Sequence, residues 1–265
     1  MIRLLLPVLV LAAAVISWLL LPPLLAGRRL RRAGAAGLGE ADRMYLRQRM
    51  PAYAAMPEAL RAQLERLTAT FLAGKVFEGC GGLQVTHLMR LAVSAQACLL
   101  ELGRGPLPFP ELRSVLLYPA GFVVDEPRED ELGVVTEGPE ELSGQAWDTS
   151  RILLSWEDVN ARAADSAYNV VIHEFAHYLH AETGGPGDEL LEAELAVLRS
   201  AIDRGEDLTL DPYGAEDTVE FFAVASEAFF ETPVRMADSH PQLYACLRRF
   251  YGVDPAGWPG WVAAS

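Results

Sequence analysis

The stretch VVIHEFAHYLH, residues 170–180, decides how this chain is interpreted, because three of the five histidines of the chain lie within it. His173, Glu174 and His177 form the pattern His-Glu-x-x-His. In a helix, residues four apart share one face and lie about 6 Å apart along the axis, so both imidazoles can reach one tetrahedral zinc ion. Glu174 then lies beside the metal, where it can take a proton from the attacking water without being a ligand.

The residues around this pattern are apolar, which is typical of a buried helix rather than a surface helix. They are Val170, Val171, Ile172, Phe175, Ala176 and Leu179. Histidine and glutamate side chains buried there without a metal would be left without partners, at a cost in stability. We therefore predict a zinc site with His173 and His177 as ligands and Glu174 as the general base.

A third protein ligand is expected, because a catalytic zinc ion usually has three and keeps its fourth position for water. Glu220 and Glu227 are the candidates, two helical turns apart in an aromatic stretch. From spacing alone, either one binds zinc while the other orients a histidine ligand from behind. His180 lies about 10.5 Å along the helix from His173, so its joining the same site would be strained.

The N-terminus is predicted to be a membrane anchor over residues 1–27. No charged residue occurs between Leu4 and Gly27, and that length spans the roughly 30 Å core of a bilayer. A cleaved signal peptide is the alternative, but its basic residues would precede the apolar run, whereas here four arginines follow it at 28–32. By the positive-inside rule, the rest of the chain faces the cytoplasm of a single-pass protein in a bacterial-type inner membrane.

Beyond the anchor we expect a juxtamembrane linker over 28–56, with room for one short helix, and one domain over 57–265. Apolar periodicity predicts an α+β domain, mostly helical, with a small sheet before the active-site helix. The expected helices are residues 60–71, 88–99, 165–182, 188–203, 217–231 and 240–250, and the expected strands are residues 114–118, 121–124, 134–136 and 152–156.

The charge of the chain argues against nucleic-acid binding, and its cysteine content argues against disulfides and a cysteine zinc site. The chain has 36 acidic against 22 basic residues, and five of the basic ones lie in the first 32 positions. So acidic a body is a poor partner for nucleic acid, whose phosphates need cations. Cys80, Cys98 and Cys246 are widely spaced and odd in number, which favours buried thiols in a reducing compartment over disulfides or a cysteine zinc site.

Several stretches together resemble the Mlc titration factor A family of zinc peptidases, whose catalytic fold is similar to that of anthrax lethal factor. The resemblance covers roughly residues 60–255. The stretches that carry it are FEG at 77–79, VLLYP at 115–119, FVVD at 122–125, GVV at 133–135, LSG at 142–144, LSW at 154–156, VIHEFAH at 171–177 and DPYGAEDTVEFFAVASEAFF at 211–230.

The resemblance implies a zincin-like metallopeptidase domain and assigns further residues. In the relatives the third ligand is a glutamate seven residues after a tyrosine near the metal, which selects Glu220 paired with Tyr213 and leaves Glu227 behind the ligands. Tyr213 would donate its hydroxyl to the developing oxyanion; the alternative is a turn residue between Pro212 and Gly214. The chain departs from the family at His180, where an aspartate is common.

The favoured function is hydrolysis of a peptide bond in a peptide or protein substrate, which would add as an extended chain to the edge of the short strands. A regulatory protein that sequesters a partner is the alternative, since the founding member of the family is named for titrating a transcriptional repressor. A different zinc hydrolase is less favoured, because nothing outside the His-Glu-x-x-His pattern indicates a small-molecule pocket.

Overall fold

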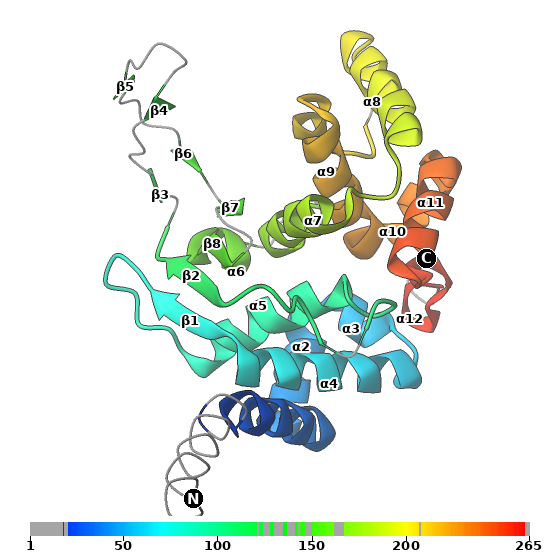
Figure 1. The fold of residues 1–265 in the computed structure, drawn as a ribbon. Coiled ribbons are helices and arrows are strands. Elements are labelled where there is room, and N and C mark those ends of the chain that lie inside the picture. Colours follow the sequence, from blue (N-terminus) through cyan, green and yellow to red (C-terminus); the bar gives the residue numbers. More distant parts are fainter. Residues whose placement is uncertain are drawn as a thin grey trace, which may run out of the picture.

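The structure, a computed structural model, describes residue 18 and residues 21–262, except for 106, 121, 124–127, 130–134, 137–140, 143, 147–149, 162–166 and 207. Figure 1 shows a small sheet beside helices from the N-terminal half of the chain, with a larger group of helices built from the C-terminal half. The structure therefore confirms the expectation of a mostly helical chain with a small sheet before the helix that carries the histidines.

Two long helices open the predicted domain and pack against each other. They are α4 (Glu58–Gly74) and α5 (His87–Leu99), and they include the two apolar stripes predicted at 60–71 and 88–99. Thr86 begins α5 because its hydroxyl accepts a hydrogen bond from the backbone N–H of Met89 at 3.3 Å, which supplies one of the free donors of the first turn.

The sheet has four strands in the order β1 (Val76–Gly79), β2 (Ser114–Tyr118), β8 (Arg151–Ser155) and β7 (Gly144–Ala146). The first three are parallel, with α5 as the connection between β1 and β2, and β7 runs antiparallel to β8. Strand β1 was not predicted. Its residues alternate poorly and are largely exposed, as suits a strand at the end of the order.

Two short antiparallel ladders lie outside this sheet. They pair β3 (Phe122–Val123) with β6 (Glu141–Leu142), and β4 (Arg128–Glu129) with β5 (Val135–Thr136). The strands predicted at 121–124 and 134–136 thus contain β3 and β5, but neither joins the four-stranded sheet.

The C-terminal half is helical, as predicted. Its elements are α6 (Trp156–Asn160), α7 (Val170–Thr183), α8 (Asp188–Asp203), η1 (Pro212–Ala215), α9 (Thr218–Glu231), α10 (Pro233–Ser239), α11 (Pro241–Tyr251), η2 (Pro255–Gly257) and α12 (Pro259–Val262). Helix α7 ends at Gly184, whose φ of 76° is left-handed and favours glycine.

Helix α7 is held in place from two sides. On one side, Phe175 lies between Phe71 of α4 and Phe109, with ring centroids 5.9 and 4.7 Å away. On the other side α7 packs against α9, which is itself fixed to α11: Ser226 Oγ and Tyr251 Oη hydrogen bond at 2.7 Å. The helix with the His-Glu-x-x-His pattern is therefore enclosed, as its apolar flanks predicted.

The segment predicted as a linker, 28–56, is instead helical and packed into the core. Residues 21–36 are helical, and α2 (Glu40–Arg49) and α3 (Pro51–Ala55) follow. Tyr53 is fully buried, and its hydroxyl donates a 2.8 Å hydrogen bond to Glu65 of α4, whose other oxygen accepts from Arg43 Nε at 2.9 Å. The folded unit therefore begins before residue 57, because contacts with α4 bury side chains that composition alone assigned to a linker.

Most of the predicted anchor, residues 1–17, 19 and 20, lies outside the described residues. Among the helices that the structure does describe, none is long and apolar enough to cross a membrane. Trp18, Leu21, Leu24 and Leu25 are exposed.

If α2 and α3 belong to the cooperative unit, Tyr53→Ala should lower the free energy of unfolding by roughly 3 to 5 kcal/mol, because it removes a fully buried aromatic side chain. Urea unfolding of the full chain measures this. Met44→Ala is the matched control: Met44 lies in α2 but is 53% exposed, and its change should stay within about 0.5 kcal/mol. Equal effects of the two substitutions would show that this segment does not contribute to the core.

Candidate metal centre

Helix α7 places the His-Glu-x-x-His pattern in the interior. Asn169 begins the helix: its side-chain oxygen accepts hydrogen bonds from the N–H groups of Val171 and Ile172, both at 3.1 Å. The helix thus starts five residues later than position 165, where the pattern predicted it. One turn later, His173 is 8% exposed and Glu174 is 3% exposed.

Three side-chain atoms from two helices converge beside this turn. His173 Nε2 lies 3.0 Å from His177 Nε2 and 3.1 Å from Glu220 Oε2, and His177 Nε2 lies 3.4 Å from the same oxygen. Ligand atoms held about 2.0 to 2.1 Å from one tetrahedral ion lie roughly 3.4 Å apart. The triangle therefore matches three ligands of a single metal ion, and these residues form a cluster of histidine and carboxylate groups suited to hold one.

Glu227 lies on the far side of His173. Its Oε1 is 2.8 Å from His173 Nδ1, and its Oε2 accepts a hydrogen bond from the backbone N–H of Asn169. A carboxylate at Nδ1 favours the tautomer that carries the proton there, which leaves Nε2 free to bind a metal. Of the two glutamates that spacing left open, the structure thus brings Glu220 to the histidine pair and Glu227 behind it.

The charges of the site favour a cation. Burial opposes the charged form of His173, but hydrogen bonds to Glu220 and Glu227 outweigh it and raise the His173 pKa to about 10. Burial also opposes the charged form of Glu220, yet its hydrogen bonds with His173 and His177 lower the Glu220 pKa to about 2. Both pKa shifts have the same cause, which is the attraction between the carboxylates and the positive charge on the histidines. A divalent ion would supply this positive charge in place of the proton on His173.

Glu174 is the buried group that protein contacts leave incomplete. Among the described residues, its Oε2 has no hydrogen-bond partner. Burial raises the Glu174 pKa to about 7, against the opposing influence of His173 and His177. The unpartnered oxygen leaves room for a hydrogen bond from a water molecule beside the triangle. A pKa near neutral pH also suits a carboxylate that accepts a proton, because a general base works best with a pKa near the operating pH.

Tyr213 lies beside His173 and is half exposed. It belongs to η1, and its ring centroid is 5.9 Å from that of His173 while 49% of the residue is exposed. Partial burial, followed by the charge of Glu220, raises the Tyr213 pKa to about 12. The phenol therefore keeps its proton at neutral pH and can donate it in a hydrogen bond to a bound molecule.

His180 does not reach the cluster. Its ring packs on Phe222, with centroids 5.7 Å apart, which agrees with the expectation that a third histidine on this helix would be strained as a ligand. Asn169 is the residue of the site that sequence reasoning missed. The available signal was an asparagine directly before an apolar helical run, which is typical of a helix start.

Two helices that present a pair of histidines and a carboxylate to one point, beside an unpartnered buried glutamate, define the site of a metallopeptidase-type protein. Comparison with known sequences agrees, because residues 25–252 match the family described as glucose-regulated metallo-peptidase M90. The chain belongs to this family.

Individual relatives cover most of the chain. Mlc titration factor A of Pectobacterium atrosepticum is 33% identical over 78% of this chain and 84% of its own length. The protein of the same name from Yersinia pestis is 34% identical over 78% of this chain and 82% of its own length. An uncharacterized protein of Synechocystis sp. is 33% identical over 79% and 82% of the two chains. The family resemblance deduced from the motifs is thereby confirmed.

The geometry predicts unequal roles for the two glutamates. Glu220→Gln should weaken metal binding more than Glu227→Gln, because loss of a direct ligand exceeds the roughly 10- to 100-fold cost of changing a group behind one. Titration of the metal-free protein with Zn²⁺ against a chelating dye measures both affinities. His173→Ala with His177→Ala should abolish binding, and a stronger loss from Glu227→Gln than from Glu220→Gln would reverse the assignment.

Proposed function

We propose that the protein is a zinc-dependent metallopeptidase with His173, His177 and Glu220 as the metal ligands. The observation that carries this proposal is the triangle of His173 Nε2, His177 Nε2 and Glu220 Oε2, with sides of 3.0 to 3.4 Å, beside the unpartnered oxygen of Glu174. Zinc suits two imidazoles and one carboxylate in tetrahedral geometry, with the fourth position left open.

Bound zinc supplies a Lewis acid that polarises the scissile carbonyl and lowers the pKa of water. The chain's own groups do the rest of the chemistry. Glu174, with a pKa of about 7, accepts the proton of the attacking water and delivers it to the leaving amine. Tyr213 retains its proton and donates a hydrogen bond to the oxyanion that forms at the carbonyl oxygen. Glu227 keeps the His173 ring oriented throughout.

The substrate is an extended peptide that pairs with a sheet edge. Strand β7 stands at one end of the strand order and packs against α7, the helix with the metal-binding histidines. A strand at such a position presents backbone N–H and C=O groups to a further strand. Pairing there would draw the peptide backbone along the site and bring one carbonyl toward the cluster.

The general-base assignment predicts that Glu174→Gln removes peptide cleavage by roughly 10² to 10⁴-fold while zinc stays bound, because the amide cannot accept the proton. Cleavage of a peptide library by the full chain, with and without chelator, measures activity, and elemental analysis measures zinc. Glu182→Gln, an exposed change on the same helix, is the matched control and should cleave normally. Wild-type cleavage by Glu174→Gln would overturn the mechanism.

A second function, binding of a regulatory protein, is favoured by one observation: several relatives are named Mlc titration factor A. On this alternative the chain sequesters a transcriptional regulator and proteolysis is secondary. The same variant separates the two functions, because Glu174→Gln would abolish hydrolysis yet leave partner binding intact.

The proposed location is the cytoplasmic face of a bacterial-type inner membrane, held by the N-terminal segment. Its support is the uncharged run from Leu4 to Gly27 followed by four arginines at 28–32. Leu21, Leu24 and Leu25, which belong to this uncharged run, are exposed, as lipid-facing side chains would be.

An anchored protein should stay with membranes after alkaline carbonate washing, whereas a peripheral protein held by charge would be released. In spheroplasts, external protease should spare the C-terminal part of the chain, since the arginines keep it inside. Digestion of that part in intact spheroplasts would show the opposite topology, and a soluble mature chain that begins near residue 27 would show that the segment is a signal peptide.

A further inference from the structure

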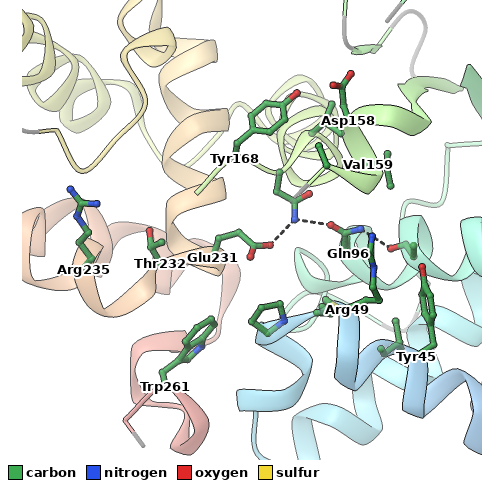
Figure 2. A pocket seen from close by; sticks show the side chains of 17 residues that line it. Tyr45, Arg49, Gln96, Asp158, Val159, Tyr168, Glu231, Thr232, Arg235 and Trp261 are labelled. Atoms are coloured by element: carbon green, nitrogen blue, oxygen red, sulfur yellow. Dashed lines mark hydrogen bonds between the residues drawn. The ribbon is translucent and has the colours of Figure 1, made fainter. Parts of the chain in front are cut away.

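Asn169 is the point at which three helices meet behind the metal centre. Its side-chain oxygen caps α7, and its amide nitrogen donates hydrogen bonds to Gln96 Oε1 of α5 at 2.7 Å and to Glu231 Oε1 of α9 at 2.6 Å. Figure 2 shows Gln96 and Glu231 reaching from opposite sides toward one amide group. All hydrogen-bonding atoms of this side chain are therefore used, so its position is closely determined.

The orientation of the amide follows from its neighbours. Gln96 Nε2 donates to the carbonyl oxygen of Ala92 at 3.0 Å, which turns Gln96 Oε1 toward Asn169. Glu231 offers only acceptors when ionised, so both groups require a donor at this point. On its other side the Asn169 side chain must accept from the N–H groups of α7. An asparagine in this orientation meets both requirements, because its NH₂ group donates to Gln96 and Glu231 while its oxygen accepts from α7.

The backbone of the same residue reaches the metal centre. The N–H of Asn169 donates to Glu227 Oε2, and Glu227 Oε1 binds His173 Nδ1 at 2.8 Å. Since the side chain fixes where the backbone N–H points, it also fixes the carboxylate that orients the histidine. Each step from one residue to the next on the path from Gln96 and Glu231 through Asn169 and Glu227 to His173 is a hydrogen bond.

We propose that Asn169 is a positioning residue that sets the metal affinity of the site, by holding Glu227 against His173. This inference rests on the proposed metal centre but concerns residues remote from the reacting atoms. Asn169, Gln96 and Glu231 all line a cavity of about 470 Å³, and the described residues that line it do not include His173, His177 or Glu220.

Asn169→Ser tests the proposal in the full chain. Serine keeps an acceptor for the N–H groups of α7, but it has no amide to bind Gln96 and Glu231. The affinity for Zn²⁺, measured by competition with a chelating dye, should fall about tenfold, the lower end of the effect of groups behind a ligand. Gln96→Leu removes one amide partner from the cavity side and should weaken binding in the same direction by a smaller factor.

Two comparisons separate positioning from a general loss of stability. Thr86→Ala removes the hydroxyl that caps the first turn of α5; Thr86 bonds Met89 and is not one of the residues on the path from Gln96 to Glu227. The melting temperature of the metal-free protein should fall by a few degrees without any change in zinc affinity. In a double-mutant cycle, Asn169→Ser should cost less than a further twofold in the Glu227→Gln background, since the path is already broken.

The outcomes are distinguishable from failure of the proposed function. If the wild-type chain binds no more Zn²⁺ than His173→Ala, the metal centre itself is refuted and the role of Asn169 falls with it. If the wild type binds zinc and Asn169→Ser binds it equally well, or if Asn169→Ser costs a full tenfold in the Glu227→Gln background, only the positioning role is overturned. Neither result depends on whether a peptide substrate is cleaved.

Discussion

Helices α7 and α9 pack against each other through ionisable side chains, and the rest of the site depends on that contact. Glu220 and Glu227 lie two turns apart on α9, so they reach His173 from its two ring nitrogens at 3.1 and 2.8 Å. An imidazole between two carboxylates has a determined orientation and a determined tautomer. The same arrangement brings His177 and Glu220 to one point, because residues four apart on α7 share a face.

The negative charges at this contact favour a bound cation. Beyond the effect of burial, the charges of Glu220 and Glu227 act on Glu174 and contribute to its raised pKa, and both Glu174 and Glu227 are almost fully buried. Without a metal the cluster is stabilised by a proton on His173, whose pKa is raised to about 10. A histidine nitrogen must be unprotonated to bind a metal, so a metal ion bound by His173 would displace that proton, and its affinity would rise as pH approaches this pKa.

Local spacing predicted which histidines share one face of a helix, whereas contacts between distant segments determine what surrounds them. His173 and His177 were identified because residues four apart on a helix lie on the same face. Glu220 and Glu227 could not be ranked from spacing, since residues seven apart share a face; the family resemblance selected Glu220, the residue that the structure brings to the histidines. The segment 28–56 was misjudged because α4 buries Tyr53, a contact that no local pattern records.

Glu174 shows how the fold sustains a group that works against stability. A buried carboxylate with an unpartnered oxygen is costly, and its raised pKa reports the cost of its ionisation. The turn that carries Glu174 is held at both ends: Phe175 packs between two aromatic rings, and Asn169 caps the start of the helix. Rigid neighbours thus hold Glu174 in a protonation range near neutral pH, which is the range in which a carboxylate can both accept and return a proton.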